Sequence, residues 1–246
     1  MNRWVFDLGN TRLKAAPLDA RGRVGEVVAI AHGAAGFEAD LARWLPRSFD
    51  VAYLASVAAE EVRVAVLQAL STRCRRIAIA RTTRRWNGLR IAYAEPSRLG
   101  VDRFLAMLAI HNANTGPALV CGVGTALTID LLDADGQHRG GRIAPSPALM
   151  REALHRRAAH LSIDGGRYSE FADDTIDALA SGCDGAALAL IERSLAEAAR
   201  EPGRAPTLVL HGGGAPGLVD RLPSARLLPT LVLDGLADWA ALDGHG

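Results

Sequence analysis

The sequence predicts an α/β fold built from two duplicated lobes. Strand-like apolar segments alternate with helical patterns along the chain, which is typical of layered α/β proteins. A strand–turn–strand unit that begins near residue 4 recurs near residue 118, and each copy has a turn containing glycine and threonine. The spacing is too long for a solenoid repeat. It indicates a duplicated lobe, with a nucleotide held in the cleft between the copies.

The first half of the chain predicts mixed strands and helices. Apolar runs predict strands at residues 4–8, 12–18, 24–30, 51–56 and 76–79. Helical spacing predicts helices at residues 37–44, 59–69 and 105–113. A turn region near residues 112–117 then separates the halves, so we expect an N-terminal lobe at 1–115 and a C-terminal lobe at 116–246.

The second half repeats the opening pattern and then becomes helical. Strands are predicted at residues 118–121, 126–132 and 207–210. Helices are predicted at residues 150–161, 174–199 and 236–242, the second of them broken or bent near Gly182 and Gly185.

Composition excludes several classes of protein. The 246 residues suit one large domain or two modest ones, and the formal net charge is +1. Such a balance does not indicate binding to nucleic acid or to an acidic membrane surface. Arginines gather at residues 73–76 and 81–85. These are either a solvated face or a nucleic-acid patch, and the lack of interleaved aromatic residues favours the first.

Cysteine usage and the N-terminus indicate a cytoplasmic protein. The three cysteines are far apart and lack zinc-binding spacing, which fits a reducing compartment. The N-terminus lacks the pattern of a signal peptide, and no apolar run approaches the ~20 residues of a membrane span. We expect no nucleic-acid or membrane partner.

The first turn is a candidate phosphate-binding hairpin. Such a hairpin needs glycine for close approach, polar side chains and often a cation, and Gly9, Asn10, Thr11 and Lys14 supply them. Asp7 ends the preceding strand, where a carboxylate can orient a hydrated metal. The alternative is an ordinary Asn-containing hairpin with a capping Asp. A Walker A loop is absent.

The second turn, at residues 122–125, includes Gly124 and Thr125 and is either a second phosphate loop or a glycine turn in a buried hairpin. A further glycine run at residues 212–214 follows a predicted strand. It either lets the backbone approach an adenine or ribose, or forms a turn without a ligand.

Asp102 and Arg103 stand at the predicted start of a helix, after Gly100 and Val101. Asp102 is either a helix cap or a group that activates a hydroxyl. A bidentate Arg103 suits a substrate carboxylate.

Together and in this order, these segments resemble the type III pantothenate kinase family, which includes the Bvg accessory factor proteins. The resemblance covers essentially the whole chain. Its most specific part is Tyr93 with Pro96 and residues 99–103, which resembles the family's Tyr…Pro…Leu-Gly-x-Asp-Arg substrate motif. The other matching segments are residues 7–14, 124–130, 140–145, 175–182 and 233–236.

The resemblance implies a two-lobed actin-like ASKHA (ribonuclease H-like) fold and a homodimer. It implies ATP-dependent phosphorylation of pantothenate to 4'-phosphopantothenate, the first step of coenzyme A biosynthesis, with Mg²⁺ and usually a monovalent cation, K⁺ or NH₄⁺. Asp102 would be the catalytic base, and Asp7 would act through Mg²⁺. The implied ATP-binding residues are Asp7, Gly9, Asn10, Thr11, Lys14, Gly124 and Thr125. The implied substrate-binding residues are Tyr93, Gly100, Val101, Asp102, Arg103 and Thr175.

Four departures from the family pattern stand out. Gly122 replaces an Asp of the cation and phosphate site, which puts the monovalent cation in question, since glycine has no side-chain ligand. Ser146 replaces a glycine, Asp174 replaces an Asn, and residues 211–214 read His-Gly-Gly-Gly instead of Thr-Gly-Gly-Asp.

Two alternatives to a pantothenate kinase therefore stay open. One is a catalytically weak or inactive nucleotide-binding regulator descended from this kinase. The other is a kinase of another small hydroxy acid or sugar, against which Tyr93 and residues 100–103 argue. For the homodimer, the apolar helix at residues 105–113 either packs across a two-fold axis or is core within one lobe.

Overall fold

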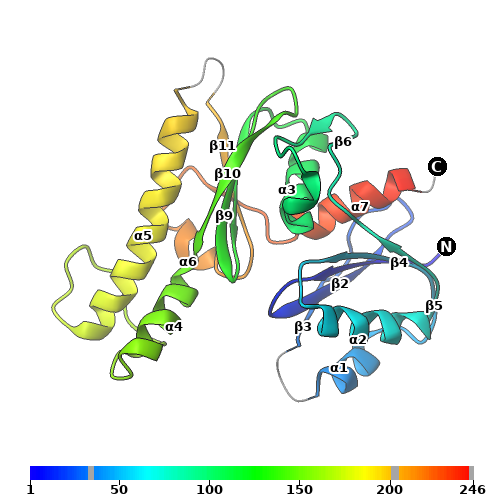
Figure 1. Ribbon diagram of the computed structural model, residues 1–246, viewed down its shortest axis with the longest axis horizontal. Coiled ribbons are helices and arrows are strands. Elements are labelled where there is room, and N and C mark those ends of the chain that lie inside the picture. Colours follow the sequence, from blue (N-terminus) through cyan, green and yellow to red (C-terminus); the bar gives the residue numbers. More distant parts are fainter. Residues whose placement is uncertain (33–35, 201–204, 244–246) are drawn as a thin grey trace. The chain divides into compact units, whose positions relative to one another are not determined.

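The structure is a computed structural model that describes residues 1–32, 36–200 and 205–243. The chain forms two compact units (Figure 1). The first comprises Met1–Asn114 and Thr230–Gly246, and the second comprises Thr115–Pro229. The C-terminal segment Thr230–Gly246 therefore belongs to the first unit, whereas the expected division assigned all of 116–246 to the second lobe.

The first unit is organised around a five-stranded sheet whose strand order is β3-β2-β1-β4-β5. β1 pairs antiparallel with β2 and parallel with β4, while β2–β3 is antiparallel and β4–β5 is parallel. The strands are β1 (Arg3–Leu8), β2 (Arg12–Leu18), β3 (Val28–Ala31), β4 (Phe49–Ser56) and β5 (Cys74–Ile79).

Helices cover both faces of this sheet (Figure 1). On one face, α1 (Phe37–Trp44) and α2 (Glu60–Ser71) enclose a core that includes Phe6, Leu8 and Leu54. Side chains alternate between the faces of a strand. Tyr53 therefore lies on the other face, where its ring contacts Trp239 of α7 (Leu231–Asp243) at 6.3 Å.

Helix α3 (Val101–Asn112) is core within the first unit, because its residues 103–110 are buried and it packs closely against α7. The approach is so close that a Cβ at Gly235 would lie 1.9 Å from the carbonyl oxygen of Leu105. This packing explains why the C-terminal helix belongs to the first unit. It also excludes α3 as an exposed face for a partner.

A small hairpin in the first unit was not predicted. It joins β6 (Arg85–Trp86) and β7 (Leu89–Arg90) through Asn87 and Gly88, which have φ values of 45° and 89°. Two residues with positive φ match the tight turns that suit hairpin twist. A 3₁₀ turn, η1 (Pro96–Arg98), then leads into α3.

The second unit repeats the sheet of the first. Its order is β10-β9-β8-β11-β12, and β8 pairs antiparallel with β9 and parallel with β11, as β1 does with β2 and β4. The strands are β8 (Ala118–Val123), β9 (Ala126–Leu132), β10 (His138–Pro145), β11 (Thr207–His211) and β12 (Arg226–Leu227). The matching order confirms the duplication predicted from the repeated strand–turn–strand unit.

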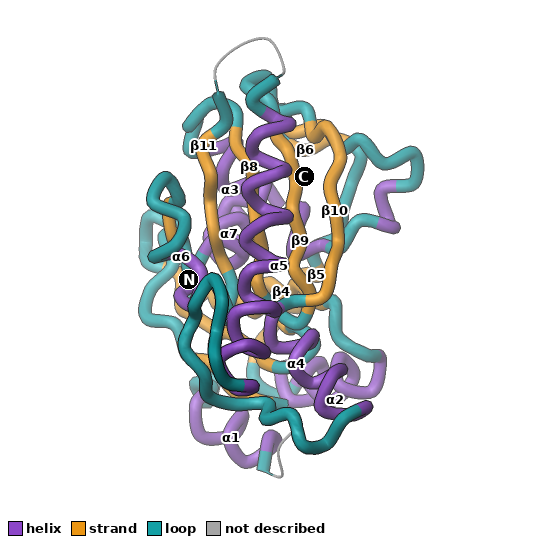
Figure 2. Tube along the Cα trace, turned by 90° about the vertical axis from the view of Figure 1, so that its left-hand side faces the viewer, coloured by secondary structure: helices purple, strands orange, loops and turns teal. Residues whose placement is uncertain are grey.

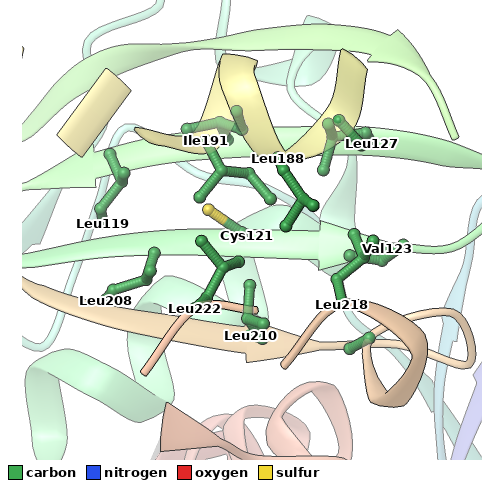
Figure 3. Close-up of a cluster of buried hydrophobic side chains, with 13 residues drawn as sticks. Leu119, Cys121, Val123, Leu127, Leu188, Ile191, Leu208, Leu210, Leu218 and Leu222 are labelled. Atoms are coloured by element: carbon green, nitrogen blue, oxygen red, sulfur yellow. The ribbon is translucent and has the colours of Figure 1, made fainter. Parts of the chain in front are cut away.

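Among the described residues of this unit, three helices accompany the sheet: α4 (Pro147–Arg157), α5 (Thr175–Ala198) and α6 (Pro216–Val219). Figure 2 shows α5 running over the strands of the sheet. Leu188 and Ile191 of α5 point onto Cys121 of β8 in a core completed by leucines of β11 and α6 (Figure 3). This packing explains why the break that the sequence allowed near Gly182 and Gly185 does not occur. α5 is a single helix through Gly182 and Gly185, and its apolar face outweighs the low helix propensity of glycine.

Two arginines of the first cluster contact the protein itself. Arg73 donates to the carbonyl oxygens of Ala42 and Leu45, and Arg76 forms an ion pair with Asp243 at 2.8 Å. In the part of the chain that the structure describes, no helix is both long enough and apolar enough to cross a membrane.

Candidate functional site

Two carboxylates come together in the first unit. Asp7 lies near the end of β1, and Asp102 lies in the first turn of α3. Burial, and then the negative charge of Asp102, raise the pKa of Asp7 to about 7, while the positive charge of Lys14 works in the opposite direction. Lys14 stands opposite Asp7 in the β1–β2 pair. The structure therefore brings together three residues that the sequence singled out.

The backbone before α3 leaves room for the Asp102 carboxylate. A Cβ at Gly100 would lie 2.5 Å from Oδ1 of Asp102, so a larger residue would displace that carboxylate. The same oxygen accepts a hydrogen bond of 2.9 Å from the backbone N–H of Arg103. Asp102 thus satisfies a backbone donor at the helix start, as a cap does, and its negative charge also acts on Asp7.

The first candidate phosphate turn is held from two sides. The N–H of Gly9 donates to the carbonyl oxygen of Arg12 at 3.0 Å. His32, just after β3, contacts the Gly9 carbonyl oxygen through Nε2 at 2.8 Å and donates its backbone N–H to Thr11 at 3.2 Å. Asn10 and Thr11 are exposed at the tip of this turn, where their polar groups can meet a ligand.

Arg103 is buried beside Tyr93. Its side chain is 5% exposed, its Nη1 donates to the Tyr93 hydroxyl at 3.4 Å, and its guanidinium lies 6.0 Å from the centre of the Tyr93 ring. A guanidinium is a side chain that binds carboxylates well, through paired charge-assisted hydrogen bonds. Arg103, Tyr93, Val101 and Asp102 all belong to the first unit.

The second candidate phosphate turn joins β8 and β9 in the second unit. The N–H of Gly124 donates to the Ala126 carbonyl oxygen at 2.9 Å. The buried Ser146 donates through Oγ to the Thr125 carbonyl oxygen at 3.0 Å and accepts from the Leu149 N–H at 3.2 Å. Ser146, a departure from the family pattern, thereby caps α4 and holds the turn.

Thr175 belongs to a different unit from the other residues expected to bind substrate. It is the exposed first residue of α5 in the second unit, whereas Tyr93 and residues 100–103 belong to the first. The preceding Asp174 caps α5 by accepting from the N–H groups of Ile176 and Asp177 at 2.7 and 3.0 Å. A carboxylate is well suited to this position, since it favours the positive end of the helix dipole.

Gly122 is flanked on both sides by larger side chains. It is paired with Thr128 of β9 and with His211 of β11. A Cβ at Gly122 would lie 2.7 Å from Thr128 Oγ1 and 2.9 Å from His211 Nε2. A larger side chain at 122 would therefore have to displace the side chains of Thr128 and His211, and glycine itself offers no side-chain ligand for a cation.

The paired carboxylates do fit a divalent cation. Asp7 and Asp102 raise the cost of each other's negative charge, and a nearby cation relieves that cost. Among the described residues, no group of three or more His, Cys, Asp or Glu side chains could hold a metal. A metal here would therefore need further oxygen ligands from phosphates or water, as Mg²⁺ commonly has.

Comparison with known sequences decides the family. The family model described as type III pantothenate kinase matches residues 4–197. The chain belongs to the type III pantothenate kinase family. Type III pantothenate kinases from Stenotrophomonas maltophilia strain K279a and Xanthomonas campestris pv. campestris strain B100 are each 58% identical over 240 residues, covering 98% of both chains.

Comparison with solved structures confirms the actin-like fold. A putative Baf family transcriptional activator from Campylobacter jejuni has a TM-score of 0.66 at 17% identity, covering 99% of this chain and 100% of that one. A putative 2-dehydro-3-deoxygalactonokinase from Sinorhizobium meliloti has a TM-score of 0.59 at 14% identity, covering 99% of both chains. An archaeal actin homologue has a TM-score of 0.53 at 10% identity, covering 98% of this chain and 99% of that one.

Sequence reasoning missed three residues that shape these turns: His32, Ser146 and His211. Each acts through a neighbour that is distant in sequence, namely Gly9, Thr125 and Gly122. His211 and Ser146 were visible as departures from the family pattern, but their contacts were not. His32 had no signal of its own in the sequence.

Proposed function

We propose that this chain transfers the γ-phosphoryl group of ATP to pantothenate, giving 4'-phosphopantothenate in the first step of coenzyme A biosynthesis. Membership of the type III pantothenate kinase family supports the reaction. The observation that carries the chemistry is the placement of Asp102 beside Asp7 and Lys14, because it joins a candidate base to a candidate phosphate turn within one unit.

Asp102 is the general base in this proposal. Its carboxylate accepts the proton of the primary hydroxyl of pantothenate while that oxygen bonds to the γ-phosphorus, and the bond from phosphorus to the bridging oxygen of ADP breaks. Phosphoryl transfer leaves the protein mainly positioning and charge stabilisation to supply. Gly100 contributes by leaving space for the Asp102 carboxylate.

Arg103 and Tyr93 hold the carboxylate of pantothenate. The buried guanidinium has a strong electrostatic preference for an anion, and the Tyr93 ring and hydroxyl fix its orientation. Val101 contributes to the same surface as the first residue of α3. Thr175 is a further substrate ligand, which the second unit supplies.

Each unit carries one phosphate-binding turn. In the first unit, the turn residues Gly9, Asn10 and Thr11 act together with Lys14. In the second unit, Gly124 and Thr125 have this role. Mg²⁺ bound through Asp7 would supply positive charge that shields the phosphate oxygens.

We also propose that the protein is a homodimer. Five of the ten large apolar side chains that are exposed among the described residues lie between residues 143 and 176 of the second unit. A cavity of about 670 Å³ between α4 and α5 is lined largely by apolar side chains, including Leu149, Met150 and Leu179. An apolar groove of this kind favours a second copy as its occupant.

A coupled assay of ADP release with a panel of acceptors tests the proposed reaction. The panel holds pantothenate, other small hydroxy acids and sugars, and a parallel titration measures ATP binding. We expect ADP release to depend on pantothenate. Preference for another acceptor would reassign the substrate, and clear ATP binding without turnover of any acceptor would indicate a regulator.

A further inference from the structure

The carboxyl ends of the parallel strands β8 and β11 carry an imidazole that the proposed reaction has not yet used. His211 is the last residue of β11, and Gly122 stands opposite it near the end of β8. In α/β sheets, ligands bind beyond the carboxyl ends of the strands. His211 is only partly buried, so a ligand at this edge of the sheet can reach it.

Two glycine-containing turns meet at this edge. Residues 122–125 form the second phosphate turn, and residues 212–214 follow β11. The N–H of Gly214 donates to the Val123 carbonyl oxygen at 2.9 Å, and Gly212 has φ of 92° with no room for a Cβ against Val123. These contacts hold the backbone that follows His211 against Val123, and so His211 lies beside the phosphate turn.

The missing side chain at Gly122 makes room for this imidazole. Nε2 and Cε1 of His211 lie 2.9 and 3.0 Å from the place of a Cβ at Gly122, and Thr128 Oγ1 lies 2.7 Å from it. The two departures from the family pattern, at residues 122 and 211, thus occur at neighbouring positions whose side chains compete for one space.

We infer that His211 is a nucleotide-binding residue whose imidazole, placed in the space that Gly122 leaves open, donates an N–H to a phosphate oxygen of ATP held at the second phosphate turn. The inference rests on the proposed ATP-dependent function. An imidazole carries at least one N–H donor in either charge state. His211 can therefore donate a side-chain hydrogen bond to phosphate at this edge of the sheet, which Gly122 cannot do because it has no side chain.

The test compares two replacements of similar size. His211→Leu fills the space without an N–H, and His211→Gln fills it with one. Binding of ATP with Mg²⁺ is measured calorimetrically without pantothenate, and KM for each substrate is measured separately. A hydrogen bond to a charged group predicts that His211→Leu raises Kd and KM for ATP about 10- to 100-fold, whereas KM for pantothenate stays unchanged. His211→Gln should retain most of the ATP affinity.

Two glycine variants provide an independent check with a matched control. Gly122→Ala places a methyl group against the imidazole and should also weaken ATP binding, whereas Gly217→Ala enters open space and should not. If neither His211 variant folds, this glycine pair decides the outcome. His160→Ala, at an exposed histidine, is the control for losing an imidazole.

Equal ATP affinity of the His211→Leu and His211→Gln variants, whether high or low, would overturn the inference, because the N–H would then be irrelevant. If those variants do not fold, equal ATP affinity of Gly122→Ala and Gly217→Ala would overturn it. A parent chain that binds ATP but does not phosphorylate pantothenate would refute the proposed function alone. A parent chain that binds no ATP would refute both.

Discussion

Asp7 and Asp102 interact electrostatically within the first unit, and the negative charge of Asp102 helps burial to raise the pKa of Asp7 to about 7. The two residues are 95 positions apart in the sequence. Their meeting joins the first phosphate turn to the start of α3. It gives both a reason for a cation at this site and a pH dependence that can be measured.

The pH dependence of stability should change in the Asp7→Asn variant. The pKa of Asp7 is raised from 3.8 to about 7, so the folded state holds a proton that the unfolded chain loses, and stability falls as pH rises between these values. Asn removes this penalty. At pH 8 we expect the variant's Tm to exceed the parent's by at least about 2 °C, an advantage that shrinks toward pH 4.

Ligand binding should reverse the order of the two Tm values at pH 8, so that the parent is the more stable protein. ATP with Mg²⁺ should raise the Tm of the parent at pH 8 but not that of Asp7→Asn, since the variant lacks the carboxylate that acts through the metal. Thermal scans with and without ligand measure both effects. Equal Tm profiles for the two proteins across pH would show that Asp7 titrates as an ordinary carboxyl.

Asp102→Asn should lower kcat while leaving ATP binding nearly intact. Asn keeps the shape and most of the capping ability but cannot accept the hydroxyl proton, and general-base catalysis predicts a loss of at least about tenfold. Steady-state kinetics and calorimetric ATP binding together provide the measurement. If the variant turned over pantothenate as fast as the parent, Asp102 would be only a helix cap.

Turnover should depend little on potassium or ammonium. Gly122 offers no side-chain ligand, and the space beside it is taken by His211 and Thr128. Replacing K⁺ by tetramethylammonium should therefore leave kcat nearly unchanged. Because His211 crowds residue 122, Gly122→Asp should make turnover dependent on potassium only when it is combined with His211→Thr. Strong potassium activation of the parent would mean that other oxygen atoms form a cation site.

Gly235→Ala should destabilise the first unit. Its Cβ would lie 1.9 Å from the Leu105 carbonyl oxygen, so α3 and α7 would have to separate. Overpacking of this kind costs about 1–3 kcal/mol in the free energy of unfolding. Denaturant titration measures it, with Gly217→Ala as the control in open space. Unchanged stability would indicate that the two helices separate without cost.

Leu154→Glu should disrupt the dimer. Leu154 lines the groove between α4 and α5 and is 45% exposed, whereas Leu242 on α7 is 42% exposed and lies outside the groove. Sedimentation should show monomers for Leu154→Glu and dimers for the parent and Leu242→Glu. A monomeric parent at micromolar concentration would rule out the dimer.

Much of the fold follows from local patterns. The apolar strands flanking residues 9–11 and 122–125 predicted both strand–turn–strand units, and α1 was predicted with its observed bounds. The β6–β7 hairpin was missed because its strands are only two residues long, although Asn87-Gly88 is a strong turn signal. The membership of α7 in the first unit depends on the contact of Gly235 with Leu105, which local pattern does not contain.

The site was predictable to the extent that its residues form short motifs. Asp7, Lys14 and Asp102 were named from such motifs, and the structure adds their proximity. The contacts of His211 with Gly122 depend on β8 and β11 being neighbours, although more than 80 residues separate them in the sequence. Cross-strand contacts of this kind follow from the sheet order and not from any single segment.

In the proposed reaction, the chain moves a phosphoryl group from ATP to the primary hydroxyl of pantothenate. Phosphorus NMR of a mixture of the purified chain, ATP, Mg²⁺ and pantothenate follows this transfer at the phosphorus atom itself. We expect a new phosphomonoester signal that matches 4'-phosphopantothenate, grows in step with ADP and is greatly reduced with Asp102→Asn. ATP that stays intact, or that yields only ADP and free phosphate, would contradict it.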